Sequence, residues 1–263
     1  MDYGLKEKLV LVTGSTKGIG RAIVEEFYGE EAKVIVHGRS EEEVKSLCYK
    51  LGKNAFGVAA DLSSAEGVNK LITEVKRIGD PDILVNNAGI FEVKAFLEIS
   101  DEDWHRFFEV NVMSGVRLSR AFFPAMLKKN WGRIIFISSE SAVNIPVEMI
   151  HYGMTKTAQL AISRGLAELT KKTGVTVNAV LPGPTMSDGV STFVKEFSRQ
   201  AGKTQEEFIN ETFFKEARPS SLIQRFADPK EVAHMVVYIA SALSSATNGA
   251  ALRVDGGVVK SII

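Results

Sequence analysis

Tyr152 and Lys156 stand four residues apart in a stretch typical of a helix, and the pair Ser138-Ser139 precedes them. Side chains at positions i and i+4 share one helix face, so the lysine ammonium can lie beside the tyrosine phenol. The phenol of a free tyrosine has a pKa of about 10, and a neighbouring cation lowers that pKa by favouring the phenolate. The pair therefore predicts proton transfer near neutral pH. The alternative is an ordinary amphipathic helix with a solvated lysine.

Short β-branched runs alternate with longer helical patterns along the chain, and these elements would position the pair. The runs are continuously apolar, as is typical of parallel strands covered on both faces. Strands are predicted at residues 9–12, 34–36, 56–59, 83–85, 134–137, 176–181 and 251–254. This order predicts one α/β domain over residues 1–263, a Rossmann-type, doubly wound parallel sheet of about seven strands with helices on both faces.

Helix starts are marked by capping patterns. Ser40 and Ser63 are each followed three residues later by a glutamate, which is the spacing of a capping box, and Asp228 precedes Pro229 in the same way that a helix N-cap precedes a first-turn proline. The helix predicted after Ser40 contains Cys48, the single cysteine, for which packing is the expected role.

The composition favours a small-molecule partner. The 32 basic and 32 acidic side chains cancel, so no net field attracts nucleic acid or an anionic membrane surface. No apolar run approaches the roughly 18 residues of a membrane span, and residues 1–8 lack the apolar region of a signal peptide, so the cytoplasm is the expected location. The four histidines show no metal-ligand spacing, and no metal is expected. His151, beside Tyr152, is expected to point to a different helix face.

The first predicted strand leads directly into the turn Thr13-Gly14-Ser15-Thr16-Lys17-Gly18-Ile19-Gly20, and a helix follows. Glycines allow the backbone to turn sharply and to approach a pyrophosphate, which then lies at the positive end of the helix. In this position the turn predicts a dinucleotide site.

The end of the second predicted strand indicates which dinucleotide binds. An acidic residue there would bind the ribose 2′-hydroxyl of NAD, but the sequence reads His37-Gly38-Arg39. Arg39 and Lys17 offer two cations where a 2′-phosphate would lie. NADP(H) is therefore the predicted cofactor, with two solvated surface bases as the alternative.

Residues 184–226 fall outside the alternating pattern. The segment is long and polar, and it contains five phenylalanines: Phe193, Phe197, Phe208, Phe213 and Phe214. Exposure of so many aromatic rings is costly unless they cover something. We expect a substrate-loop insertion that acts as a lid, with two rigidly packed helices as the alternative.

The motifs in this order resemble those of the short-chain dehydrogenases/reductases, including the 3-oxoacyl-[acyl-carrier-protein] reductases. The resemblance covers residues 5–257. It rests on the glycine turn, Asp61-Leu62, Asn86-Asn87-Ala88-Gly89, Asn111, Ser139, Tyr152, Lys156 and Pro182-Gly183.

The resemblance implies a role for each matched residue. Tyr152 would be the general acid, Lys156 would bind the nicotinamide ribose and lower the tyrosine pKa, and Ser139 would orient the substrate carbonyl. Asn111 would hold a water that relays protons to Lys156, although an ordinary buried amide is the alternative. The residues expected at the cofactor are Gly14, Ser15, Thr16, Lys17, Gly18, Ile19, Gly20, Arg39, Asp61, Leu62, Asn87, Ala88, Gly89, Tyr152, Lys156, Pro182, Gly183, Thr185 and Ser187. Among them, Asp61 would bind the adenine amino group and Asn87 would lie at the adenine ribose.

Two features depart from the family pattern. Ser187 stands where many relatives have a threonine that binds the carboxamide, and the hydroxyl is retained. Residues 184–226 are longer than expected of a fatty-acid-cycle reductase, so thioesters of the acyl carrier protein are not assumed as substrates.

Together these observations predict an NADPH-dependent reductase that converts a ketone, 3-oxoacyl-like or other, to a secondary alcohol. The alternatives are a dehydrogenase of a secondary alcohol, sugar or steroid, and a cofactor-binding regulator without chemistry. A homotetramer is also expected, from the resemblance and from the apolar patterns at residues 107–123 and 149–169.

Overall fold

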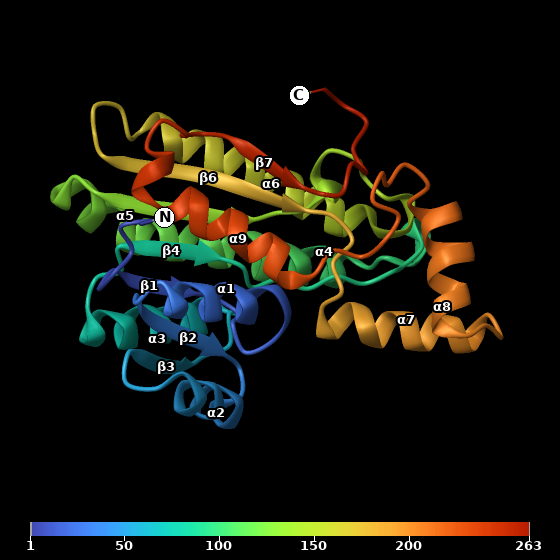
Figure 1. The fold of residues 1–263 in the computed structure, drawn as a ribbon, viewed down its shortest axis with the longest axis horizontal. Helices are drawn as coiled ribbons and strands as arrows, with labels where there is room; N and C mark the ends of the chain where they lie inside the picture. The colour runs from blue at the N-terminus through green and yellow to red at the C-terminus, as the bar shows by residue number, and fades with distance from the viewer. Residues whose placement is uncertain (1, 263) are drawn as a thin grey trace.

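The computed structural model describes residues 2–262, and its centre is one seven-stranded parallel sheet (Figure 1). The strand order is β3-β2-β1-β4-β5-β6-β7, and every neighbouring pair is parallel. The strands are β1 Leu9–Val12, β2 Lys33–Gly38, β3 Ala55–Ala59, β4 Ile83–Asn86, β5 Gly132–Ile137, β6 Val175–Pro182 and β7 Ala251–Val254. The predicted fold class is confirmed, since the chain order reverses between β1 and β4 as in a doubly wound sheet.

Helices cover both faces of this sheet. They are α1 Gly18–Gly29, α2 Glu41–Leu51, α3 Ala65–Ile78, α4 Asp101–Phe108, α5 Ser114–Lys129, α6 Ile150–Glu168, α7 Asp188–Gln200, α8 Gln205–Glu207 and α9 Pro229–Ala240. Shorter 3₁₀ turns lie at Phe96–Glu98, Glu140–Ala142, Val147–Met149 and Ala242–Ser244, and π-helical turns at Glu109–Met113 and Phe208–Ala217. No helix within residues 2–262 is both long enough and apolar enough to cross a membrane.

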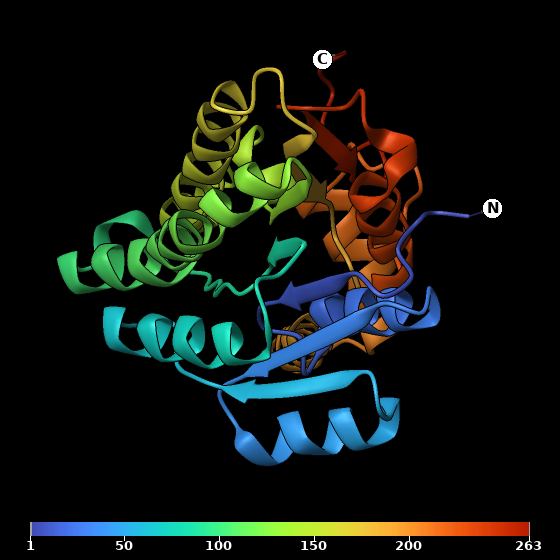
Figure 2. The same ribbon diagram turned by 90° about the vertical axis from the view of Figure 1, so that its left-hand side faces the viewer.

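Strand alternation explains the two faces. Val10, Val12 and Val34 point into one core cluster, which α1, α2 and α9 cover, whereas Leu11 and Ile35 point into the other, which α3, α5 and α6 cover. Figure 2 shows the two helical layers on opposite sides of the sheet. Because both faces are buried, most positions of the central strands are apolar, which is the pattern seen in the sequence.

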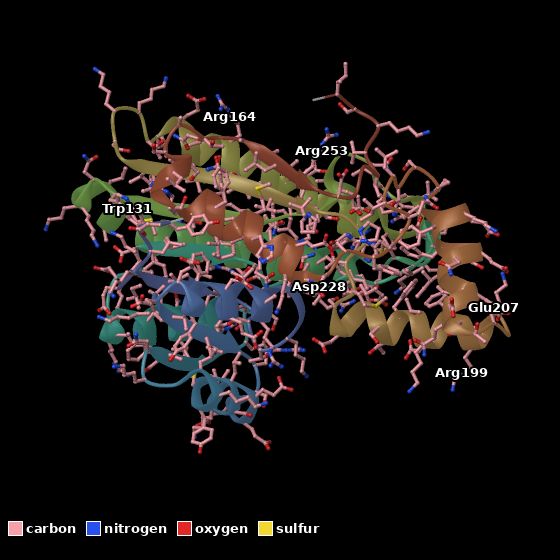
Figure 3. The ribbon with its side chains drawn as sticks, in the orientation of Figure 1. Trp131, Arg164, Arg199, Glu207, Asp228 and Arg253 are labelled. Atoms are coloured by element: carbon pink, nitrogen blue, oxygen red, sulfur yellow. The ribbon has the colours of Figure 1, made fainter. Side chains whose placement is uncertain are left out.

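Helix starts follow the predicted caps with one shift. The Ser40 hydroxyl accepts a hydrogen bond from the Glu43 amide, and Asp228, labelled in Figure 3, caps α9 in a capping box with Glu231. In the other predicted box the cap is Ser64, which accepts from Gly67, and not Ser63. The reason is local: the Ser63 amide already donates to Asp61 Oδ1, so the helix begins one residue later.

Residues 184–226 contain α7, α8 and the π-helical turn Phe208–Ala217, and Figure 1 shows α7 and α8 together at one end of the molecule. Their aromatic side chains form a third apolar cluster, separate from the two sheet cores. Its members are Val190, Phe193, Val194, Phe197, Phe208, Ile209, Phe213, Phe214 and Phe226. The phenylalanines of the insertion therefore pack mainly on one another.

Candidate active site

The loops that follow β1 and β4 meet where the strand order reverses. Thr13 Oγ1 accepts hydrogen bonds from the amides of Asn87 and Ala88, both at 2.9 Å. The Asn87 side-chain amide donates to the carbonyls of Thr13 and Gly14 at 2.8 and 3.1 Å. Asn87 therefore holds the glycine turn in place, a use of its side chain that was not expected from the sequence.

His37, at the end of β2, is a second support of this turn. Its Nδ1 accepts a hydrogen bond from the Gly14 amide at 3.0 Å, and its Nε2 lies 3.2 Å from the Ala60 carbonyl. Because Nδ1 accepts, the ring proton belongs on Nε2, where it donates to Ala60. Burial lowers the pKa of His37 to about 4, so the ring stays neutral and keeps both bonds at physiological pH.

The glycine turn has the shape that a pyrophosphate requires. Gly14 and Gly18 have φ values of +62° and +56°, and a Cβ added at Gly20 would lie 2.3 Å from the Gly14 carbonyl oxygen. The Lys17 side chain does not cap helix α1, so it leaves the first amides at the positive end of the helix available to an anion. The Gly18 amide binds the Asp188 carboxylate at 2.8 Å, a protein anion in the place of a phosphate. The residues present therefore fit a dinucleotide.

The two cations predicted for a 2′-phosphate differ in their surroundings. Lys17 Nζ forms an ion pair with Glu43 Oε1 at 2.6 Å, and Glu43 also accepts a hydrogen bond from Thr16. Arg39 is exposed, and among residues 2–262 no carboxylate pairs with it. Asp61 is the predicted adenine ligand. A hydrogen bond from the Ser63 amide lowers the pKa of its carboxyl group, so Asp61 is an anion.

Tyr152 and Lys156 lie on α6 as predicted, with the Lys156 Nζ 5.6 Å from the centre of the tyrosine ring. The ammonium donates to the Ile137 carbonyl at 2.9 Å and to Gln159 Oε1 at 3.4 Å. An ammonium has three donors, so one remains for a ribose hydroxyl. Burial lowers the pKa of Lys156 to about 8, since the charged form loses hydration.

The pKa of Tyr152 differs from the expectation. In the protein chain alone it is raised, first by burial and then by the Glu140 carboxylate, while a hydrogen bond with Ser139 and the Arg218 guanidinium act in the opposite direction. Lys156 is not among the groups that lower it, and its ammonium donates to a backbone carbonyl. Tyr152 is therefore held in the protonated form, the form that can donate.

The two serines that end β5 have different partners. Ser138 Oγ donates to the Lys156 carbonyl at 2.9 Å and so supports helix α6. Ser139 Oγ donates to Glu140 Oε2 at 2.5 Å and accepts from the Ser141 amide at 3.1 Å. The two hydroxyls are therefore bound to different groups, and Ser139 stays the predicted catalytic serine.

Asn111 lies in the π-helical turn Glu109–Met113, an irregularity that is frequent at functional sites. Its side chain is 1% exposed and bonds both backbone groups of Ile90 and the Thr155 hydroxyl, at 2.8 to 3.0 Å. The backbone carbonyl of Asn111 accepts a hydrogen bond from Gln159 Nε2 at 2.6 Å, and Gln159 in turn contacts Lys156. Gln159 thus joins Asn111 to Lys156, a link that the sequence analysis did not contain.

His151 is fully buried and packs on Phe107, with ring centres 4.1 Å apart. It points to a different face of α6 from the tyrosine hydroxyl, as expected. Across the described residues, no group of three or more histidine, cysteine, aspartate or glutamate side chains is arranged to hold a metal ion.

A cavity of about 490 Å³ brings ten of the predicted site residues together. Its wall includes Ile19, Asn87, Gly89, Ser139, Tyr152, Lys156, Pro182, Gly183, Thr185 and Ser187. Phenylalanines of the 184–226 segment complete the wall. Outside it lie Asn111, Ala88, Arg39, Asp61, Leu62 and the residues of the glycine turn other than Ile19. The charged cavity residues Glu140, Glu148 and Arg218 are among those that the sequence analysis missed. Glu140 could have been noticed as an acid that directly follows a buried strand and Ser139.

A parallel sheet with a glycine turn at its switch point, and a tyrosine, a lysine and a serine around one cavity, define a Rossmann-type oxidoreductase. A family model described as short chain dehydrogenase matches residues 8–197, and the chain belongs to this family.

Relatives in known proteins cover the whole chain. The uncharacterized oxidoreductase YvrD of Bacillus subtilis is 51% identical, with 100% of both chains covered. The 3-oxoacyl-[acyl-carrier-protein] reductase FabG of Aquifex aeolicus is 35% identical over 98% of this chain and 100% of its own. Among solved structures, L-sorbose reductase of Gluconobacter frateurii complexed with NADPH and L-sorbose has a TM-score of 0.92 at 33% identity, with both chains fully covered.

Proposed function

We propose that this oxidoreductase reduces a ketone to a secondary alcohol with NADPH, and that Tyr152 is the general acid. The observation that carries the proposal is the cavity, in which Tyr152, Ser139 and Lys156 face the same space as Ile19 of the glycine turn. The pKa of Tyr152 is raised, so the phenol is protonated at neutral pH and ready to donate. Reduction consumes such a proton, whereas alcohol oxidation needs the phenolate.

The residues divide the remaining work. The glycine turn and the start of α1 would hold the pyrophosphate, and the third donor of Lys156 would hold the nicotinamide ribose. The cofactor, when bound, supplies the hydride. Tyr152 gives its proton to the carbonyl oxygen as the carbon is reduced, and Ser139 fixes the position of that oxygen.

NADP(H) is the cofactor, and Arg39 is the residue proposed to select it. Arg39 stands at the end of β2 without a carboxylate partner in the described chain, so its guanidinium can bind a 2′-phosphate. The solved structure of the similar L-sorbose reductase contains NADPH, which supports this choice.

Two features of the cavity favour different substrates. Its aromatic wall, formed by phenylalanines from 184–226, favours a partly apolar ketone, as in 3-oxoacyl compounds. The charged residues Glu140, Glu148 and Arg218 form a polar part of the same wall, and the similar L-sorbose reductase acts on a sugar, so a hydroxylated ketone is the second candidate. Alcohol oxidation by the same residues is the reverse reaction.

A panel of ketones, diketones, acyl thioesters and keto sugars, followed by NADPH absorbance, tests the proposal, with alcohols and NADP⁺ as the reverse panel. Tyr152→Phe is expected to lower turnover by at least about 100-fold, because the proton donor acts in the transition state. NADPH affinity should stay nearly unchanged. Tyr49→Phe, at a 91% exposed tyrosine on α2, is the matched control. Full activity of the Tyr152 variant would contradict the assigned acid.

A further inference from the structure

A buried carboxylate stands directly beside Ser139. Glu140 is 5% exposed, and its Oε2 accepts hydrogen bonds from Ser139 Oγ at 2.5 Å, from the Ser141 amide at 2.7 Å and from Ser141 Oγ at 3.0 Å. A hydroxyl has one proton to donate. Glu140 therefore competes with Tyr152 and with a substrate carbonyl for the single proton of Ser139.

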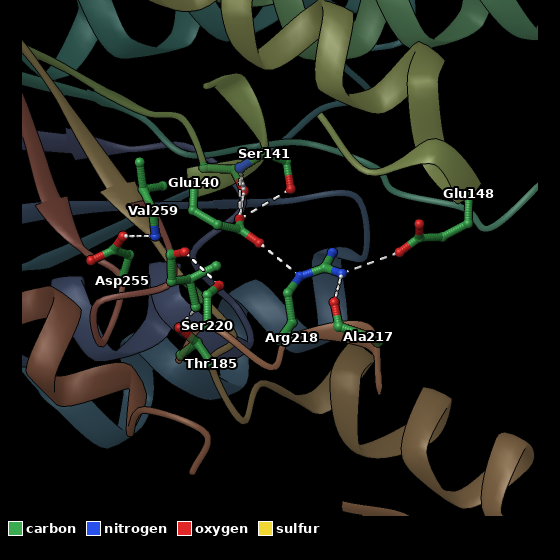
Figure 4. A network of polar contacts seen from close by, with 12 residues as sticks. Glu140, Ser141, Glu148, Thr185, Ala217, Arg218, Ser220, Asp255 and Val259 are labelled. Carbon is green, nitrogen blue, oxygen red and sulfur yellow. Dashed lines mark hydrogen bonds and ion pairs between the residues drawn. The ribbon is translucent and has the colours of Figure 1, made fainter. Parts of the chain in front are cut away.

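The other oxygen of Glu140 binds an arginine from the 184–226 segment. Arg218 follows the π-helical turn Phe208–Ala217, and its Nε lies 3.2 Å from Glu140 Oε1. Its Nη1 lies 3.3 Å from Glu148 Oε1, and Figure 4 shows the guanidinium between the two carboxylates. The side chains of Arg218 and Glu140 are 11% and 6% exposed. Breaking such a buried pair leaves an uncompensated charge, so each residue constrains the other.

These contacts form one continuous chain from the insertion to Ser139, namely Arg218 to Glu140 and Glu140 to Ser139. All three residues line the same cavity as Tyr152. We propose that the Glu140–Arg218 ion pair is the link through which residues 184–226 set the hydrogen bonding of Ser139 and the electric field at Tyr152. Glu140 and Arg218 are then positioning residues for the reaction. This inference rests on the proposed function.

The two partners act on Tyr152 with opposite signs. The charged groups that face Tyr152 are Lys156 on its own helix, Glu140 on the turn after β5 and Arg218 from the insertion, with Glu148 paired to Arg218. The Glu140 carboxylate disfavours the phenolate and raises the pKa of Tyr152, whereas the Arg218 guanidinium favours the phenolate and lowers it. When the insertion is docked, Arg218 offsets the field of Glu140.

The test is the pH dependence of alcohol oxidation by the enzyme with NADP⁺, which requires the phenolate. Glu140→Gln should move the midpoint to lower pH, and Arg218→Gln should move it to higher pH, each by on the order of one pH unit. The double variant should return close to the wild-type midpoint. Glu196→Gln, which removes a carboxylate from an exposed position of α7 in the same insertion, is the matched control.

If the pair has a purely structural role, the pH midpoints of both single variants shift in the same direction, or activity falls without a change in the midpoint. Either result overturns the proposal. Arg218→Lys keeps the charge and should restore the wild-type midpoint. If Glu140→Gln does not fold, the comparison of Arg218→Gln with Arg218→Lys decides alone.

A second readout needs no substrate. The tyrosinate absorbance of Tyr152 is obtained, with NADP⁺ bound, as the difference between each variant and the same variant that also carries Tyr152→Phe. The opposite shifts should appear there too. If the ketone and alcohol panels show no turnover, the proposed function fails, but the tyrosinate midpoints still decide whether the link exists.

Discussion

Arg39 and Lys17 are chemically similar, but their surroundings separate them. Lys17 is already bound by Glu43, and a phosphate would have to replace that carboxylate, whereas Arg39 has no such competitor among residues 2–262. A guanidinium also offers two parallel donors to a phosphate, which an ammonium does not. At the scale of single residues, cofactor preference should therefore depend mainly on Arg39.

We predict that the wild-type protein prefers NADPH to NADH by more than about tenfold in kcat/KM, since a charge-assisted hydrogen bond contributes about 1.5 to 3 kcal/mol. Arg39→Asp should reverse the preference by repelling the 2′-phosphate and binding the ribose 2′-hydroxyl. Lys17→Gln, the matched loss of a cation, should have a smaller effect. The measurement is kcat/KM with each cofactor, and equal values in the wild type would contradict the assignment.

Lys156 supplies a prediction that does not depend on activity. Its pKa falls from 10.5 to about 8 on burial, so between these pH values the unfolded chain binds more protons than the folded protein, and this residue makes stability rise with pH. Below pH 8 the buried charge is destabilising. Relative to wild type, Lys156→Met should therefore be most favourable to stability near pH 7, and its advantage should shrink as the pH rises toward 10.5.

Urea unfolding at pH 7 and pH 9.5 measures this change, with Lys128→Met, at an exposed lysine of α5, as the control for loss of one charge. If the difference in unfolding free energy between the wild type and Lys156→Met is the same at both pH values, the Lys156 ammonium is not destabilised by burial.

The sequence allowed accurate prediction where local pattern decides the structure. The apolar runs predicted all seven strands, because side-chain period and burial are local consequences of a two-sided sheet. It did not predict the Glu140–Arg218 pair, whose members are 78 residues apart, because that contact depends on the path of the insertion. The direction of the Tyr152 pKa was also missed, since burial and the Glu140 carboxylate raise it and Lys156 is not among the groups that lower it.

At the scale of elements, the insertion contacts both halves of the site. Arg218 near its end reaches Glu140, and Asp188 at the start of α7 accepts a hydrogen bond from the Gly18 amide at the start of α1. A carboxylate in that position competes with a pyrophosphate for the same positive helix end. We therefore expect the insertion to shift at Asp188 when a dinucleotide binds.

We predict that Asp188→Asn binds NADPH more tightly, by about two- to fivefold, since removal of one charge near a helix end is worth about 0.3 to 1 kcal/mol. Fluorescence titration of NADPH measures the affinity, with Asp101→Asn, in the first turn of the distant helix α4, as the control. Hydrogen exchange should also show that amides from 187 to 214 change protection when NADPH and substrate bind. Unchanged affinity together with unchanged protection would favour a rigid insertion over a lid.

At the scale of the whole molecule, the outer face of α6 is the feature that bears on assembly. The buried face of this helix holds Lys156 and Gln159, while Ala161 and Gly165 are exposed on the opposite side, and a Cβ added at Gly165 would meet no atom within 4 Å. Figure 3 shows Arg164 on this outer side. Small residues allow another helix to approach closely, and Leu169, at the end of the helix, is 63% exposed.

We predict a homotetramer in which this face of α6 packs on a second copy of the chain, because closed symmetric assemblies bury the same patch on both partners. Light scattering at micromolar concentration should give about four times the chain mass of 28.7 kDa. Ala161→Glu places a charge on the face without disturbing the sheet core, so it should lower the measured mass while the subunit still unfolds cooperatively. Tyr49→Glu, at an exposed aromatic residue of α2 on the other face of the sheet, should leave the mass unchanged. A wild-type mass equal to that of one chain would show that the helix is an ordinary solvated surface.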